Sequence, residues 1–205
     1  MRESIHLALG DSTGTGVGAS SGGGYPERLC SLLRAADPAL RLINLSRNGD
    51  TSADLIADQL PRASRTQPRL ITICIGINDL GLQLPDDAFA LNLEEIALAL
   101  RKLDAPIVIG NIPDLALAPA VQRLVPRSLY EKRIEIFNEH VTATAARHHL
   151  APVDLYSWSR ELLPEHPEFF SPDGFHPSAY GYQVWAERMF AVALPLLRMP
   201  AAIPA

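Results

Sequence analysis

The sequence predicts an α/β fold in which a five-stranded parallel sheet lies between two layers of helices. Short apolar runs alternate along the chain with longer segments whose apolar residues recur at helical spacing. This alternation is typical of βαβ units, which set their strands parallel. The chain has 205 residues, which suits one domain over residues 1–205. We expect the strand order 2-1-3-4-5.

Each predicted strand is a short run rich in Ile, Leu and Val. Residues 70–75 form the most apolar run, so we expect them at the centre of the sheet. The other predicted strands are residues 5–9, 40–45, 106–112 and 152–156.

Apolar stripes with a period of 3.6 residues predict helices that pack on the sheet. They cover residues 25–36, 51–64, 87–103, 128–149 and 178–197. Thr51 or Ser52 is suited to cap the second of these helices, and Ser178 the last. Residues 113–127 and 157–172 are predicted as long loops of the kind that form lids or binding sites. The Pro/Ala-rich tail, 199–205, is expected to fray.

Composition excludes several classes of protein. The net charge is −5 and the basic residues are not clustered, so a nucleic-acid partner is not expected. Neither a signal peptide nor an apolar stretch long enough for stable membrane insertion is visible, which predicts a cytoplasmic protein; a chain trimmed of its leader would look the same. Cys30 and Cys74 lack a CxxC partner and are expected to be buried apolar residues. No feature indicates an oligomeric state.

The stretch Gly-Asp-Ser-Thr-Gly, residues 10–14, follows directly on the first predicted strand. It places Ser12 at the carboxyl end of that strand on a glycine-assisted turn, where an α/β protein can present a nucleophile. Taken alone, the same residues also suit an ordinary turn and helix cap.

A base and an acid for that serine stand near the other end of the chain. In Pro172-Asp-Gly-Phe-His-Pro177, Asp173 precedes His176 by three residues. A histidine can take the proton of a serine hydroxyl, and a carboxylate can fix the tautomer of the histidine. A single histidine beside proline is otherwise often a surface residue.

Three donors are available for an oxyanion. Asn78 follows the central strand, the N–H of Gly49 follows the second strand, and the N–H of Ser12 follows the first. The carboxyl ends of parallel strands meet at one edge of the sheet, where α/β proteins form their sites. Each residue alone has an ordinary explanation as a turn or cap, but together and in this order they favour a catalytic site.

At these residues the chain resembles the SGNH, or GDSL-like, hydrolase superfamily. The blocks Gly10-Asp11-Ser12, Gly49, Gly76-x-Asn78-Asp79 and Asp173-x-x-His176 occur in the family's order, although Thr13 stands where the family has leucine. The resemblance implies a flavodoxin-like three-layer fold and serine ester hydrolysis without metal or cofactor. It also implies Ser12 as nucleophile, His176 as base, Asp173 as its orienting acid, and an oxyanion hole of the Ser12 and Gly49 N–H groups and the Asn78 side chain.

Other interpretations fit only parts of the sequence. Gly14-x-Gly16-x-x-Ala19 fits a dinucleotide fingerprint, and Arg47 could suit an NADP phosphate, but Asp11-Ser12-Thr13 separate the glycines from the strand. Gly10-x-Ser12-x-Gly14 fits the α/β-hydrolase elbow, but that fold has several strands before its serine. His148-His149 lacks the neighbours of a metal site. A protein that only binds a ligand would have no use for Ser12, Asp173 and His176 in this order.

We therefore expect hydrolysis of acyl esters through an acyl-Ser12 intermediate, with the NADP-type protein as the alternative. The substrate class is a small-molecule, carbohydrate or lipid ester with an acetyl or a short to medium acyl group. Apolar residues of the loop 112–126, with Phe169 and Phe170, either line an acyl pocket or pin the loops to the core. The sequence leaves both roles open.

Overall fold

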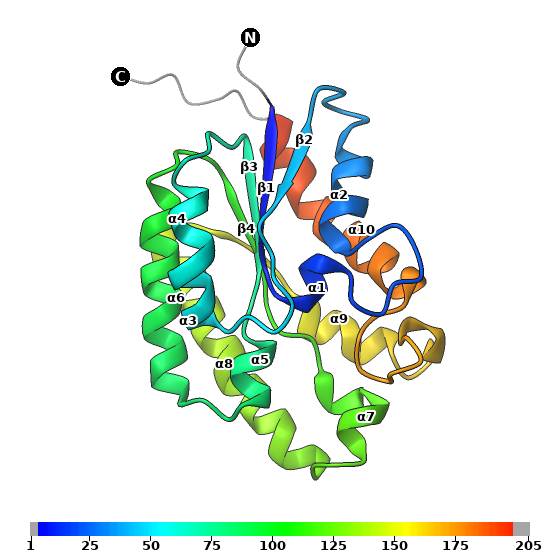
Figure 1. The fold of residues 1–205 in the computed structure, drawn as a ribbon. Helices are drawn as coiled ribbons and strands as arrows, with labels where there is room; N and C mark the ends of the chain where they lie inside the picture. Colours follow the sequence, from blue (N-terminus) through cyan, green and yellow to red (C-terminus); the bar gives the residue numbers. More distant parts are fainter. Residues whose placement is uncertain (1–3, 199–205) are drawn as a thin grey trace.

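The computed structural model describes residues 4–198, which form a parallel sheet covered by helices on both faces (Figure 1). The strand order is β2-β1-β3-β4-β5, as predicted. Every neighbouring pair of strands is parallel. The strands are β1 (Ile5–Gly10), β2 (Arg41–Asn44), β3 (Leu70–Cys74), β4 (Ile107–Gly110) and β5 (Ala151–Val153).

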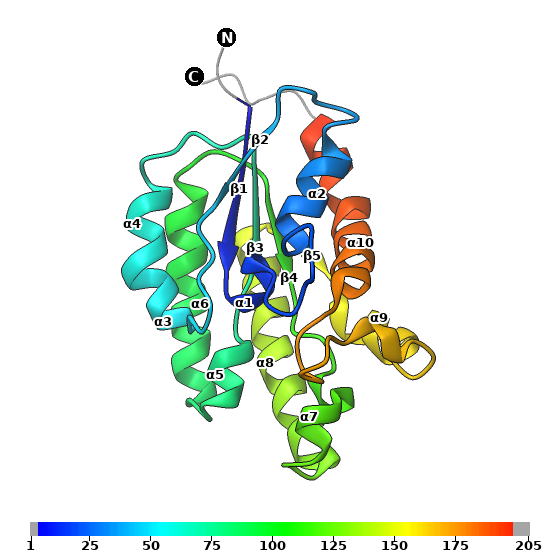
Figure 2. The same ribbon diagram turned by 45° about the vertical axis from the view of Figure 1, so that its right-hand side comes forward.

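Two helical layers enclose the sheet, which confirms the three-layer α/β/α prediction (Figure 2). Successive strand residues point to opposite faces. Ile71 therefore packs in the larger apolar cluster with α6 and α8, whereas Leu70 packs in the other with α2 and α10. Helices α4 (Leu60–Ala63), α6 (Asp86–Arg101) and α8 (Arg127–His148) contribute to the larger cluster, and α3 (Ser52–Asp54) lies on the same face of the sheet (Figure 1). Helices α2 (Tyr25–Leu33) and α10 (Ala179–Arg198) contribute to the other cluster.

Short helices gather at the edge of the sheet where the strands end, at the bottom of Figure 1. They are α1 (Ser12–Thr15), α5 (Ile77–Gly81), η2 (Leu115–Leu117), α7 (Pro119–Gln122), α9 (Leu155–Leu162) and η3 (Pro167–Phe169). This edge is where ligands bind in open parallel sheets.

Two predictions in the last third of the chain were wrong. The predicted strand 152–156 ends at Val153, and α9 occupies much of the predicted loop 157–172. The helix begins early because the Asp154 side chain accepts a hydrogen bond from the Ser157 N–H at 3.0 Å, and the Asn111 side chain accepts one from the Leu155 N–H. The predicted loop 113–127 likewise contains η2 and α7.

The predicted helix 51–64 is present, but it contains one wider turn. Thr51 and Asp54 form a reciprocal capping box at its start. Between α3 and α4 lies the π-helical turn η1 (Leu55–Gln59), in which the Leu60 N–H donates to the Leu55 carbonyl. Gln59 is fully buried at the end of this turn. The Ser178 cap is also confirmed, since its hydroxyl accepts a hydrogen bond from the Gly181 N–H.

Three further expectations concern the chain as a whole. Cys30 and Cys74 are buried and free, as predicted. Among the helices within residues 4–198, none has the length and apolar character needed to cross a membrane. The predicted tail 199–205 lies outside the described residues.

Candidate active site

Ser12 lies just beyond the end of β1, as the first residue of α1. Asp11 caps this helix: its Oδ1 accepts hydrogen bonds from the Thr13 N–H at 2.9 Å and from the Thr13 hydroxyl at 2.8 Å. Asp11 therefore caps the helix, and Ser12 is presented at its first position. The first N–H groups of a helix have no partner inside it, so the Ser12 N–H is suited to bind an anion.

Asp11 is a buried acid directly beside this serine. Burial raises the pKa of its carboxyl to about 6, although the hydrogen bonds from Thr13 and the nearby His176 act in the opposite direction. Among the described residues, its second oxygen, Oδ2, has no hydrogen-bond partner. The ionised form of Asp11 is therefore disfavoured in the folded protein.

The loop before α10 holds Asp173 and His176 together. Asp173 Oδ2 lies 2.7 Å from His176 Nδ1, and Asp173 Oδ1 accepts the Phe175 N–H at 2.8 Å and the Ser171 hydroxyl at 2.8 Å. Partial burial acts to raise the pKa of Asp173, but the hydrogen bonds from Phe175, His176 and Ser171 outweigh it and lower the pKa to about 2. Asp173 is therefore an anion at neutral pH and favours the tautomer with hydrogen on Nδ1.

His176 joins this loop to Ser12. Its Nε2 lies 3.1 Å from Ser12 Oγ, so one hydrogen-bonded chain runs from Asp173 through His176 to the serine. Tyr182 of α10 donates to the Val17 carbonyl at 2.8 Å, which ties the segment after α1 to the same helix. With Nδ1 protonated, Nε2 is free to accept the serine proton.

The three predicted oxyanion donors follow three neighbouring strands. Ser12 follows β1, Gly49 follows β2, and Asn78 is the second residue of α5, just after β3. The Asn78 amide donates one hydrogen to the Asp50 carbonyl at 2.8 Å, and an amide nitrogen carries a second hydrogen. Gly49 has a φ of 86°, which favours glycine.

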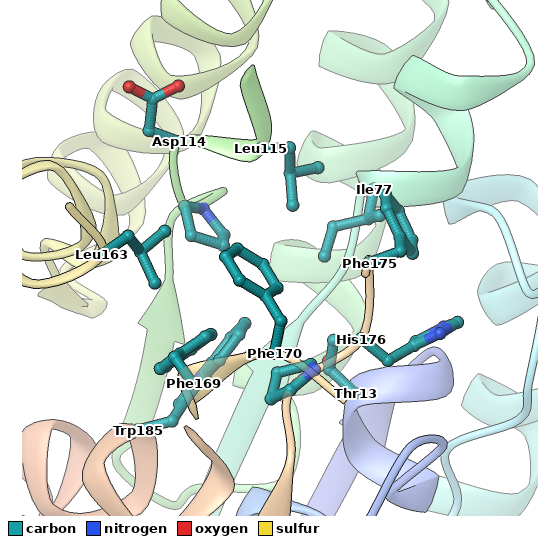
Figure 3. Close-up of a pocket in the computed structure, with 12 residues that line it drawn as sticks. Thr13, Ile77, Asp114, Leu115, Leu163, Phe169, Phe170, Phe175, His176 and Trp185 are labelled. Atoms are coloured by element: carbon teal, nitrogen blue, oxygen red, sulfur yellow. The ribbon is translucent and has the colours of Figure 1, made fainter. Parts of the chain in front are cut away.

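An apolar cavity of about 20 Å³ lies behind Thr13 and His176, with room for about one water molecule. Figure 3 shows the Phe170 ring in the middle of the lining residues, while the His176 imidazole points away from it. Leu115 and Leu163 also line it, and the Asp114 carboxylate turns away. Phe169 is buried and packs against Trp158, so it pins the loop as well as lining the cavity.

Comparison with known proteins identifies the family. The sequence profile of the "GDSL-like Lipase/Acylhydrolase family" matches residues 8–184. The chain belongs to this family. The match includes both the serine segment and the Asp173–His176 loop.

Relatives of known structure or name support the GDSL-like assignment. A GDSL-like esterase, Rv1075c of Mycobacterium tuberculosis, is 27% identical over 191 residues; the match covers 91% of this chain and 60% of that relative. The chain thus spans less than two thirds of that curated relative. The structure of TesA is 25% identical, with a TM-score of 0.74 over 95% of this chain and 98% of that one.

Axe2, an acetylxylan esterase from Geobacillus stearothermophilus, is 21% identical. Its TM-score is 0.76 over 100% of this chain and 98% of that one. At this identity the likeness shows a shared fold.

The dinucleotide alternative is not supported in this GDSL-like chain. Gly14 lies inside α1 and Gly16 caps its end, so the glycine stretch does not open a helix directly after β1. At Gly18 a Cβ would stand 2.8 Å from the Pro177 carbonyl oxygen, so this glycine allows the chain to pass close to the His176 loop. Arg47 is paired with Asp58. Within residues 4–198, no group of three metal-ligating side chains could hold a metal ion.

Sequence reasoning missed two residues that hold the site. The Ser171 hydroxyl donates a hydrogen bond to Asp173. The sequence feature that could have indicated it is a serine two residues before the acid. Gln59 bonds to both Gly10 and Asp50, and its signal was an amide on the apolar side of a predicted helix. Thr13, which stands where the family has leucine, lies in the wall of the cavity.

Proposed function

We propose that this protein is a carboxylic ester hydrolase in which Ser12 is the nucleophile, His176 the general base and Asp173 the acid that orients it. The observation that carries the proposal is the hydrogen-bonded chain Asp173–His176–Ser12, with steps of 2.7 and 3.1 Å. The family to which the chain belongs and its GDSL-like esterase relative support the same chemistry.

In the first step, Ser12 Oγ attacks the ester carbonyl carbon while His176 Nε2 takes the hydroxyl proton. The carbonyl oxygen becomes an oxyanion, which the N–H groups of Ser12 and Gly49 and the Asn78 side chain stabilise. The tetrahedral intermediate collapses, His176 returns the proton to the leaving oxygen, and the alcohol departs. Acyl-Ser12 remains.

In the second step, His176 removes a proton from a water molecule that attacks acyl-Ser12. The second tetrahedral intermediate uses the same donors, and its collapse releases the carboxylic acid and returns the proton to Ser12. Asp173 stays ionised throughout and stabilises the imidazolium that forms twice in each cycle.

We further propose that the acyl group is acetyl or similarly short. The cavity beside Thr13 and His176 is apolar, and its free volume of about 20 Å³ suits a methyl group better than a long chain. Phe170 fills its middle (Figure 3). That Axe2, which shares the fold, is an acetylxylan esterase is consistent with this size, and an acetylated carbohydrate is the first natural substrate class to test.

The experiment is a chain-length series of p-nitrophenyl esters, from acetate to octanoate, with acetylated xylan beside it. The wild type should prefer acetate, and Ser12→Ala should lose at least about 10³-fold in kcat/KM while remaining folded. Full activity in folded Ser12→Ala would show that the nucleophile is wrong. A preference for octanoate would contradict the proposed short acyl group but would not contradict Ser12 as the nucleophile.

A further inference from the structure

Gln59 is a polar side chain in an apolar layer of the protein. It stands at the end of the π-helical turn η1 with no exposed surface. A buried amide is costly unless its donors and acceptor are paired. Here both are used: Oε1 accepts the Gly10 N–H at 3.0 Å, while Nε2 donates to the Gly10 carbonyl at 2.7 Å and to Asp50 Oδ2 at 2.9 Å.

The bonds to Gly10 complete the hydrogen bonding at the end of β1. The pairing of β1 with β2 ends at Ala8 and Asn44, so β1 extends beyond its neighbour. Alternate residues of a strand hydrogen-bond to the same side, which directs the N–H and C=O of Gly10 toward the side of β2, just beyond the end of that strand. The Gln59 amide lies there beside the chain that follows β2, whose Arg47 N–H donates to the same Gly10 carbonyl at 3.2 Å. Gln59 pairs both the N–H and the carbonyl of Gly10 and so helps to fix the last residue of β1, two positions before Ser12.

The bond to Asp50 reaches the other two oxyanion donors. Asp50 directly follows Gly49, and its own carbonyl accepts the hydrogen bond from the Asn78 side chain at 2.8 Å. One buried amide therefore connects the Ser12 turn to the Gly49–Asp50 turn, and through Asp50 to Asn78.

We propose that Gln59 is a positioning residue that sets the spacing of the three oxyanion donors. The inference rests on the proposed function, because it concerns the site that the proposal describes. Gln59 does not touch the reacting atoms; it acts through Gly10 and Asp50. Donors fixed before the reaction stabilise the transition state without reorganising, so a small misplacement is costly.

The expected signature is a change in kcat rather than in KM. The oxyanion develops only in the transition state, whereas the bound ester makes little use of the same donors. Gln59→Leu should lower kcat by about 10- to 100-fold and change KM by less than about threefold. Inactivation by diisopropyl fluorophosphate should slow in parallel, because its phosphoryl oxygen also gains charge as Ser12 attacks.

A matched control separates positioning from packing. Leu55 is fully buried at the start of the same π-helical turn. Leu55→Ala should lower the thermal midpoint at least as much as Gln59→Leu. At a temperature where both variants are folded, Leu55→Ala should keep kcat within about twofold of the wild type. An equal loss of kcat in both would reduce Gln59 to a packing role and overturn the inference.

A second pair of variants serves if Gln59→Leu does not fold. Asp50→Asn keeps an oxygen that can accept from Gln59, and Asp50→Ala does not. The inference expects kcat to fall in Asp50→Ala and to be largely restored in Asp50→Asn. Unchanged kcat in folded Asp50→Ala or Gln59→Leu would contradict it. If the wild type neither cleaved an ester nor reacted with the fluorophosphate, the proposed function itself would have failed, and the inference with it.

Discussion

The Asp173 side chain beside His176 is held by hydrogen bonds from its own loop, whereas Gly10, at the end of the strand before Ser12, is held by a side chain from a distant segment. Asp173 accepts its hydrogen bonds from Ser171, Phe175 and His176, and its side chain is 44% exposed. On the other side, Gln59 reaches the end of β1 from a separate helix and is fully buried.

The acid–base pair is therefore a local motif, whereas the proposed oxyanion donors depend on the tertiary arrangement. The acid and base keep their relation wherever the short loop folds, so their spacing in the sequence carries the geometry. The proposed oxyanion donors keep their relation only if three strand ends and one buried amide are all in place. Substitutions on the two sides should therefore fail in different ways.

The largest effect is expected in the loop that carries Asp173 and His176. Asp173→Asn keeps the loop's size but loses the charge that holds the Nδ1–H tautomer of His176. We expect kcat to fall on the order of 10³- to 10⁴-fold in steady-state assays with p-nitrophenyl acetate. Glu168→Gln, which alters a carboxylate paired with His166 in the same region, is the control and should keep full activity. A loss below about tenfold in Asp173→Asn would show that His176 does not depend on this acid.

Among the residues held by tertiary contacts, Asn78→Ala removes one proposed oxyanion donor. We expect a loss of about 10²- to 10³-fold in kcat with KM little changed. The measurement is steady-state kinetics, with circular dichroism to verify folding. A rise in KM at constant kcat would instead assign Asn78 to binding of the ground-state ester.

Asp11 gives the buried side a pH dependence of stability that is opposite in sign to that of Asp173, whose lowered pKa acts only below about pH 4. Its pKa in the folded protein is about 6, against an ordinary value of 3.8, so the native state keeps a proton that the unfolded chain loses. Stability should therefore fall as pH rises from about 4 to about 6 and then level off.

Asp11→Asn should remove this pH-dependent loss in the free energy of unfolding, which amounts to about 3 kcal/mol. Urea unfolding of both proteins at pH 4, 5, 6 and 7 provides the measurement. A constant difference in free energy of unfolding across that range would show that Asp11 ionises without a penalty.

The smallest expected effect concerns the acyl group. Phe170→Ala opens the cavity beside Thr13 and should raise the ratio of hexanoate to acetate turnover by about tenfold. Leu124→Ala is the matched control, because Leu124 is 81% exposed and does not line the cavity. If both variants kept the wild-type chain-length profile, the acyl group would bind elsewhere.

The sequence predicted the sheet order and the residues at its carboxyl edge, because strand hydrophobicity and the short Asp173–His176 spacing are local signals. It did not predict α9, whose start depends on the local cap Asp154 and also on Asn111, a residue that folding brings from another segment. It also missed Gln59. An amide inside an apolar stripe marks an anomaly, but only the tertiary structure shows that Gly10 and Asp50 are its partners.

The central claim, that Ser12 is the nucleophile, is tested most directly by covalent labelling. The protein is treated with diisopropyl fluorophosphate, digested, and mapped by mass spectrometry, with Ser12→Ala and His176→Ala alongside. We predict one adduct, on the peptide containing Ser12, with loss of esterase activity in step, and little or no labelling of either variant. An adduct on another residue, or an unlabelled Ser12 in protein that has lost its activity, would contradict the account.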